Sequence, residues 1–209
     1  MPVLLKIDSS ADLETSRTRA LTSALADAWR QRGPEYDVVV RDLHLDPLPH
    51  LRTPAQHWPE RLRDGASVPD HLGRLQQTVL AELLAADAVV VGAPMYNYSM
   101  PSTLKAWVDL IHVPGLTAPF DEQTRPLADR PAVIVIARGA AYDTGTPTEG
   151  WDHVTPPLRL VLGRALGMDV HVVATSRTLS DRVPTLDAER AGAELEAALV
   201  ESRRLGATI

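Results

Sequence analysis

Short, solidly apolar runs alternate with stretches of helical spacing along the whole chain. The helical spacing is clear where Leu21, Leu25 and Trp29 recur four residues apart before a Gly-Pro pair. Apolar runs without alternation are typical of strands buried on both faces, so the pattern predicts a doubly wound α/β fold with a five-stranded parallel sheet between two layers of helices. The predicted strands are residues 3–7, 38–40, 88–91, 133–137 and 170–174. The predicted helices are residues 16–33, 72–83, 101–114, 151–167 and 186–205.

The organisation of the chain indicates a single domain over residues 1–209, without an internal repeat, a low-complexity tract or a linker. A hydrophobic content of 44% and a charged content of 23% are ordinary for a globular protein. Residues 44–70 form a long irregular connection rich in Pro, His and Arg. A connection of this length is usually functional or contacts a partner.

Charge and composition exclude several classes of function. The formal net charge is −6, and the arginines are interleaved with acidic residues, which argues against nucleic acid or an anionic membrane as partner. No apolar stretch approaches the ~20 residues of a membrane span, and the apolar run at the N-terminus is too short for a signal peptide. We therefore expect a cytoplasmic protein. The absence of cysteine excludes disulfides and thiolate chemistry, and the seven histidines show no zinc-like spacing, so no metal site is expected.

The loop after the first predicted strand carries hydroxyl groups and leads directly into a helix. It has neither the Gly-rich dinucleotide fingerprint nor a triphosphate Gly-Lys-Ser/Thr motif. The hydroxyls of Ser9, Ser16 and Thr18, with backbone N–H groups and the helix N-terminus, fit one terminal phosphate. The alternative is that Ser16 only caps the helix and the other hydroxyls face solvent. This segment alone does not decide between the two.

Two further loops follow neighbouring strands, where ligands bind in open α/β sheets. The first places Met95, Tyr96, Asn97 and Tyr98 between a buried strand and a helix, as expected for a loop that contacts a flat heteroaromatic ring. A hydrophobic plug under the loop is the alternative, most plausible for Met100. The second loop, residues 137–142, contains Gly and Ala, which allow a ligand to approach the backbone closely.

These residues resemble those of a known family. IDSS with Ser16-Arg17-Thr18, then VVVGAPMYNYSMPSTLKAWVDLI, then ARGAAY are similar to the FMN-dependent NADH-azoreductases, which are also NAD(P)H:quinone oxidoreductases. The resemblance covers residues 3–173. It implies a flavodoxin-like fold, FMN as cofactor, NADH or NADPH as electron donor and a quinone or azo compound as acceptor. It also implies a homodimer with the flavin at the subunit interface, and ping-pong hydride transfer through flavin N5.

The resemblance, together with the residues of the three loops, predicts a set of site residues in this sequence. The residues expected at the flavin phosphate are Ser9, Ser10, Ser16, Arg17 and Thr18. Those expected at the flavin ring are Pro94, Met95, Tyr96, Asn97, Tyr98, Ala137, Arg138, Gly139 and Ala140. Tyr98, Phe120 and Tyr142 are expected to contact substrate, and Tyr142 and Asn97 are the candidates for a catalytic role.

The chain departs from its apparent relatives on the substrate side. Relatives usually have Ser-Arg-Gly-Gly at residues 137–140, Phe at Tyr98 and a further Phe within residues 160–168. The connection at residues 117–130 is also shorter. Trp58 is either a lid contributed across a dimer interface or an anchor for its own loop.

Two other classes of protein share the expected fold: a flavodoxin-like electron carrier and a non-catalytic FMN-binding module. The modest charge and the long 44–70 connection argue against the carrier.

Overall fold

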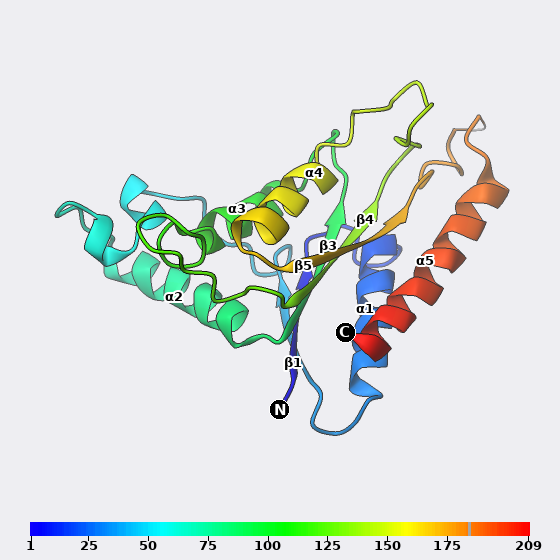
Figure 1. Cartoon of the computed structure of the whole chain (residues 1–209). Helices are drawn as coiled ribbons and strands as arrows, with labels where there is room; N and C mark the ends of the chain where they lie inside the picture. The colour runs from blue at the N-terminus through cyan, green and yellow to red at the C-terminus, as the bar shows by residue number, and fades with distance from the viewer. Residues whose placement is uncertain (184) are drawn as a thin grey trace.

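The computed structural model describes residues 1–183 and 185–209. Its centre is a five-stranded, all-parallel sheet with strand order β2-β1-β3-β4-β5 (Figure 1). The strands are β1 Val3–Asp8, β2 Asp37–Asp42, β3 Ala88–Pro94, β4 Pro131–Ala137 and β5 Asp169–Thr175. This order and the helices on both faces confirm the predicted flavodoxin-like doubly wound sheet.

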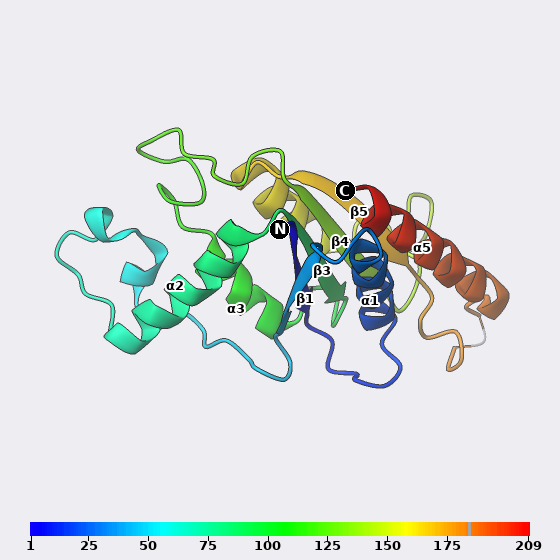
Figure 2. The ribbon, with the colours of Figure 1, turned by 90° about the horizontal axis from the view of Figure 1, so that it is seen from below.

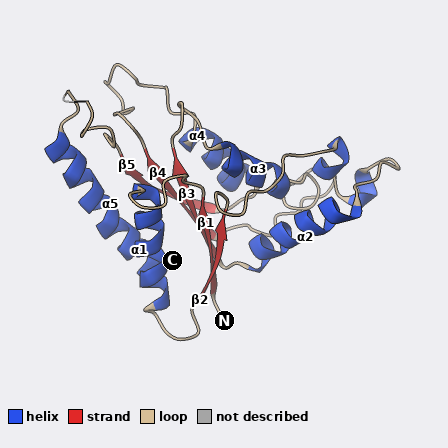
Figure 3. Cartoon of the chain, turned by 180° about the vertical axis from the view of Figure 1, so that it is seen from behind, coloured by secondary structure: helices blue, strands red, loops and turns tan. Residues whose placement is uncertain are grey.

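Helices cover the sheet on both faces, as Figures 1 and 3 show from opposite sides. One face carries α1 Arg17–Arg30 and α5 Ala188–Thr208. The other face carries α2 Asp70–Ala85, α3 Ser102–Ile111, α4 Thr155–Leu158 and the π-helical segment Arg159–Ala165 that continues α4. Within the described residues, no helix is both long and apolar enough to span a membrane. That the chain forms a single domain stays a prediction.

The two helical layers pack into two separate cores. Leu21, Leu25 and Trp29 of α1 pack on one face of the sheet, and Leu104 and Trp107 of α3 belong to the core on the other face. Every residue of β3 is buried, as its solidly apolar sequence predicts. The same prediction is wrong for β2, where the side chains of Val39 and Val40 are 37% and 53% exposed. The physical reason is position: β2 is an edge strand.

Helix boundaries were the other source of error. The helix predicted over residues 151–167 begins only at Thr155, because the Asp152 carboxylate accepts the N–H groups of Val154 and Thr155, both at 2.9 Å, and forms a turn. The two prolines that follow Thr155 are tolerated because they lie in the first turn. The last helix begins at Ala188 rather than near Leu186, because the side chain of Asp187 caps it.

The residues 44–70 are largely irregular, as predicted, but contain two short 3₁₀ helices, η1 Pro54–His57 and η2 Glu60–Leu62. Figure 2 shows this segment lying beyond the N-terminal half of α2, away from α1 and α5. The chain leaves β1 toward one face of the sheet and β3 toward the other. Because β1 and β3 are neighbours, their carboxyl ends form the switch point at which ligands bind in this class of fold.

Candidate functional site

The loop after β1 begins with two buried serines that face different groups. The Ser9 hydroxyl donates to the carbonyl oxygen of Gly92 on β3 at 2.6 Å. The Ser10 hydroxyl lies 3.3 Å from the Tyr96 hydroxyl, which also accepts the backbone N–H of Ala11 at 3.1 Å. The loop after β1 and the loop after β3 are therefore joined through Tyr96.

The hydroxyls of Ser16 and Thr18 meet at the N-terminus of α1. Ser16 caps the helix by accepting the N–H of Arg19 at 3.3 Å, and its oxygen lies 3.0 Å from Thr18 Oγ1. Capping is thus a real role of Ser16, and it leaves the helix N-terminus next to a pair of hydroxyls. The Arg17 guanidinium turns toward the connection after β5, where it donates to Thr175 Oγ1 at 3.1 Å and to the carbonyl oxygen of Ser176 at 3.3 Å.

Residues 96–99 form a tight hairpin at the end of β3. Tyr96 and Ser99 exchange backbone hydrogen bonds of 2.9 and 3.1 Å, and the two residues between them, Asn97 and Tyr98, have positive φ of 48° and 71°. Asn adopts this left-handed conformation readily, whereas Tyr rarely does. Strained backbone of this kind is found most often at functional sites. Met95 and Met100, on either side of the hairpin, are partly buried against the core, which supports the plug interpretation for both.

The hairpin is covered by the segment that follows β4. The ring of Tyr98 meets the ring of Trp151 edge to face, with centroids 5.6 Å apart, and its carbonyl accepts the N–H of His153 at 3.0 Å. Tyr142 lies in the same segment, and burial, with Tyr98 nearby, raises the pKa of its phenol. The Tyr142 hydroxyl is therefore protonated at neutral pH and available as a hydrogen-bond donor.

The loop after β4 is held by protein contacts. The buried Arg138 side chain donates to Ser176 Oγ at 3.1 Å and to Asp143 at 3.0 Å, and lies 3.5 Å from Asp152. A Cβ on Gly139 would lie 3.0 Å from Leu179 Cδ1, so the glycine accommodates the connection after β5. Pro94 and Ala137 are the last paired residues of β3 and β4, and the Ala140 carbonyl accepts the N–H of Arg177 at 3.5 Å.

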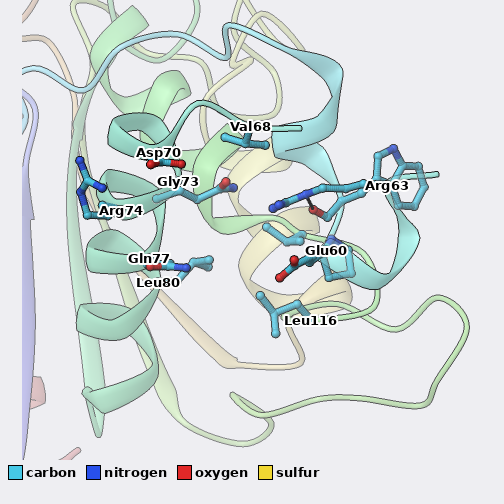
Figure 4. Close-up of a pocket in the computed structure, with 13 residues that line it drawn as sticks. Glu60, Arg63, Val68, Asp70, Gly73, Arg74, Gln77, Leu80 and Leu116 are labelled. Carbon is cyan, nitrogen blue, oxygen red and sulfur yellow. Dashed lines mark hydrogen bonds between the residues drawn. The ribbon is translucent and has the colours of Figure 1, made fainter. Parts of the chain in front are cut away.

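The structure brings the loops that carry most of the predicted site residues to neighbouring strand ends, and three of these residues, Ser9, Tyr96 and Asn97, line one groove. A groove of about 410 Å³ lies at the switch point and is lined by Ser9, Ala11, His44, Tyr96, Asn97, Met100, Pro101, Ser102 and Thr103. Phe120 lies elsewhere, in the connection after α3, where its ring is 60% exposed and packs on Trp58 with centroids 5.0 Å apart. Trp58 lines a second cavity, of about 440 Å³, between the 3₁₀ helices and α2 (Figure 4).

The residues at the switch point fit a phosphate joined to a planar ring. The phosphate side offers hydroxyls, a backbone N–H and a helix N-terminus, a donor set that suits a phosphate. The ring side offers a backbone turn and aromatic side chains. Among the described residues there is no cluster of three or more His, Asp or Glu side chains that would hold a metal ion.

The sequence carries little signal for two residues that contribute to the site, Trp151 and Arg19. Trp151 was assigned to a helix, and nothing local to it signals its contact with Tyr98. Arg19 is not among the predicted site residues, although its side chain turns back to the carbonyl of Ser10. Its position one residue after the Ser16-Arg17-Thr18 motif was the only available signal.

Comparison with known proteins supports one family over nearly the whole chain. Residues 3–199 match the family described as "Flavodoxin-like fold". An FMN-dependent NADH:quinone oxidoreductase of Kineococcus radiotolerans is 58% identical over the full length of both chains. FMN-dependent NADH:quinone oxidoreductase 2 of Bradyrhizobium diazoefficiens is 42% identical over 77% of this chain and 80% of its own.

Solved structures show the same fold. An azoreductase from Bacillus anthracis str. Sterne superposes with a TM-score of 0.82 at 19% identity and full coverage of both chains. An FMN-dependent NADH-azoreductase from Bacillus anthracis str. Ames Ancestor, solved in complex with FMN, gives 0.79 at 17% identity over 99% of this chain and 100% of its own.

Proposed function

Because the chain belongs to the flavodoxin-like family that contains the FMN-dependent NADH:quinone oxidoreductases, we propose that it is an FMN-dependent NAD(P)H oxidoreductase that reduces quinones or azo compounds. FMN held by the loops at the switch point would supply hydride-transfer chemistry at its N5, with NADH or NADPH and the acceptor used in successive ping-pong half-reactions. The observation that carries the proposal is the contact of Tyr96 with Ser10 and Ala11. This contact joins the phosphate-binding loop and the ring-binding turn into one site.

The chain's own groups have separate tasks in this proposal. Ser10, the Ala11 N–H and the Ser16–Thr18 hydroxyl pair bind the phosphate. The left-handed turn at Asn97 presents backbone groups to the polar edge of the ring, so Asn97 positions the cofactor. The side chain of Arg138 holds the loop after β4 in shape through Ser176 and Asp143. The backbone of residues 138–140 in this loop faces the flavin ring. Ser9 and Arg17 support these loops through contacts with the protein.

Tyr98 and Tyr142 are the residues that we propose to contact the acceptor. Both lie where the loops after β3 and β4 meet, and the protonated Tyr142 hydroxyl can donate to an acceptor oxygen or nitrogen. Phe120 and its neighbour Trp58 lie in a different part of their own chain. We therefore propose that this aromatic pair, of which Phe120 is exposed and Trp58 is half-buried, reaches the site of a second copy in a homodimer. With NADH as donor, the cytoplasm is the expected compartment.

The test is a visible absorption spectrum of the purified protein, followed by NADH oxidation with a quinone and, separately, with an azo dye. We expect a yellow protein, or apoprotein that turns yellow with FMN, and acceptor-dependent NADH consumption. A colourless protein that FMN cannot reconstitute would overturn the proposal. Yellow protein without NADH or NADPH oxidation would favour an electron carrier or a non-catalytic FMN-binding module.

A further inference from the structure

Arg19 lies in the first turn of α1, but its side chain turns back beneath the loop that precedes the helix. Its Nε and Nη2 donate to the carbonyl oxygen of Ser10 at 3.2 and 2.7 Å. Its Nη1 and Nη2 also donate to the two carboxylate oxygens of Asp42, at the end of β2, at 2.5 and 3.0 Å. The guanidinium therefore spans the loop carbonyl and the neighbouring strand with a planar, forked set of donors.

This contact fixes the orientation of the peptide between Ser10 and Ala11. In a trans peptide the C=O and the N–H point in opposite directions, and no cis peptide occurs in the described part of the chain. With its carbonyl held by Arg19, the peptide points the Ala11 N–H away from Arg19. That N–H donates to the Tyr96 hydroxyl at 3.1 Å, and Ala11 and Tyr96 both line the groove at the switch point.

We propose that Arg19 is a positioning residue: it orients the Ser10–Ala11 peptide so that the Ala11 N–H, which donates to the Tyr96 hydroxyl in this structure, points into the groove and donates to the phosphate when FMN is bound. The inference rests on the proposed function, because it concerns the same cofactor. Arg19 acts through the peptide rather than as a charge that attracts the phosphate, since Asp42 already neutralises it. Nothing in the sequence motif Ser16-Arg17-Thr18 assigns this task to the residue that follows.

Asp42 keeps the guanidinium in the plane that reaches Ser10. Burial opposes the ionisation of Asp42, but the hydrogen bonds from Arg19 and from the N–H groups of Leu45 and His44 hold the pKa of its carboxyl below the ordinary value. Asp8 lies further off, with its carboxylate 3.8 Å from Arg19 Nη1. Removing the charge of Asp42 would free the guanidinium to leave the peptide.

The experiment compares FMN with riboflavin, which has the same ring but no phosphate. Apoprotein is titrated with each flavin, and binding is followed by quenching of flavin fluorescence. For Arg19→Ala we expect affinity for FMN to fall about 10- to 100-fold, the loss typical of a hydrogen bond to a charged group. Affinity for riboflavin should change by less than about twofold, because the ring contacts stay intact.

Three variants distinguish positioning from charge and from general instability. Arg19→Lys keeps the charge but not the fork, so it should lose most of the FMN preference, whereas a purely electrostatic role would preserve it. Asp42→Asn should give a smaller loss of the same kind. The control is Arg30→Ala. Arg30 lies on the same helix, and its Nη1 is 3.6 Å from the Asp27 carboxylate at the surface, so this variant should bind FMN and riboflavin like the wild type.

The outcomes separate the two proposals. If Arg19→Ala weakens FMN and riboflavin equally, or neither, Arg19 is not a phosphate-positioning residue, although the wild type still binds FMN. If Arg19→Lys keeps the wild-type FMN preference, the role is electrostatic and the positioning proposal is wrong. If the wild type binds neither flavin, the proposed function itself fails.

Discussion

The two loops that meet at Tyr96 are held in place by different forces. The loop after β1 is fixed by charges beneath it: Lys6 and Asp8 form a buried ion pair at 2.5 Å, and Arg19 joins the loop to Asp42. Among the described residues, the hairpin after β3 makes no ion pair and is held by its left-handed backbone and by the ring of Trp151. The two halves of one site therefore depend on different physics.

The difference matches what each half has to recognise. In the proposed function, the first half binds the FMN phosphate, which does not change during turnover, so a rigid set of oriented donors suits it. In the proposed function, the other half receives NADH or NADPH and then the electron acceptor on one face of the ring, and apolar contacts suit such an exchange of ligands. Among the described residues, the hairpin itself is held by aromatic rings and backbone rather than by ion pairs, whereas the ion pairs of Arg138 with Asp143 and Asp152 hold the loop after β4. Perturbing charge should damage the first half, and perturbing shape the second.

The largest effect is expected at Asp8. Asp8→Ala removes the partner of the buried Lys6 and the acceptor of the Thr22 hydroxyl, so the free energy of unfolding should fall by about 3–5 kcal/mol. Urea unfolding measures it. The matched control is Lys6→Met with Asp8→Leu, which replaces the pair by apolar groups and should recover most of the loss. A double variant as unstable as Asp8→Ala would show that the charges themselves are required.

At the hairpin, shape rather than charge should decide stability. Asn97→Val places a β-branched residue at φ 48°, and we expect a loss of about 1–3 kcal/mol. Asn97→Gly keeps the backbone conformation without strain and should be as stable as the wild type or about 1 kcal/mol more stable. Thermal unfolding of the two variants in parallel tests this. Equal melting temperatures would mean that the hairpin relaxes and stores no strain.

The fold was predictable from the sequence, because it rests on local signals. The five apolar runs mark the strands, and topology then brings the loops beginning at Ser9, Met95 and Arg138 to one edge. The contacts within the site were not predictable. Arg19 contacts Asp42, which lies 23 residues later in the sequence. Trp151 contacts Tyr98 although α3 and β4 separate the two residues in the sequence. Such pairs depend on how loops cross, which propensity and periodicity do not encode.

Trp151 provides a smaller test on the acceptor side. Trp151→Ala removes one aromatic pair, equivalent to about 0.5–1.5 kcal/mol, and should raise the KM for the quinone roughly two- to tenfold. FMN affinity should stay at the wild-type value, because the phosphate side is untouched. Steady-state kinetics at saturating NADH give the KM, and Trp151→Phe, which keeps an aromatic ring, should be nearly normal. A loss of FMN without a change in KM would reverse the assignment of the two halves.

The smallest expected effects concern two titrating groups, His112 at the end of α3 and Asp42 beneath the loop after β1. His112 caps α3 at the end away from the hairpin and stacks near His57, and burial, with the charge of His57, holds its pKa below the ordinary 6.5. Its folded pKa is depressed, so its contribution to stability is complete above about pH 6.5 and is lost as pH falls toward the folded pKa. Asp42, whose pKa is held below 3.8, loses its contribution only as pH falls below that value.

The two groups should therefore weaken the fold in separate pH windows. In urea unfolding from pH 8 to pH 3, His112→Gln should flatten the decline between pH 7 and pH 5 and leave the acid limb unchanged, since glutamine does not titrate. Asp42→Asn should flatten only the acid limb. Profiles for His112→Gln that run parallel to the wild type would show that His112 titrates alike in both states.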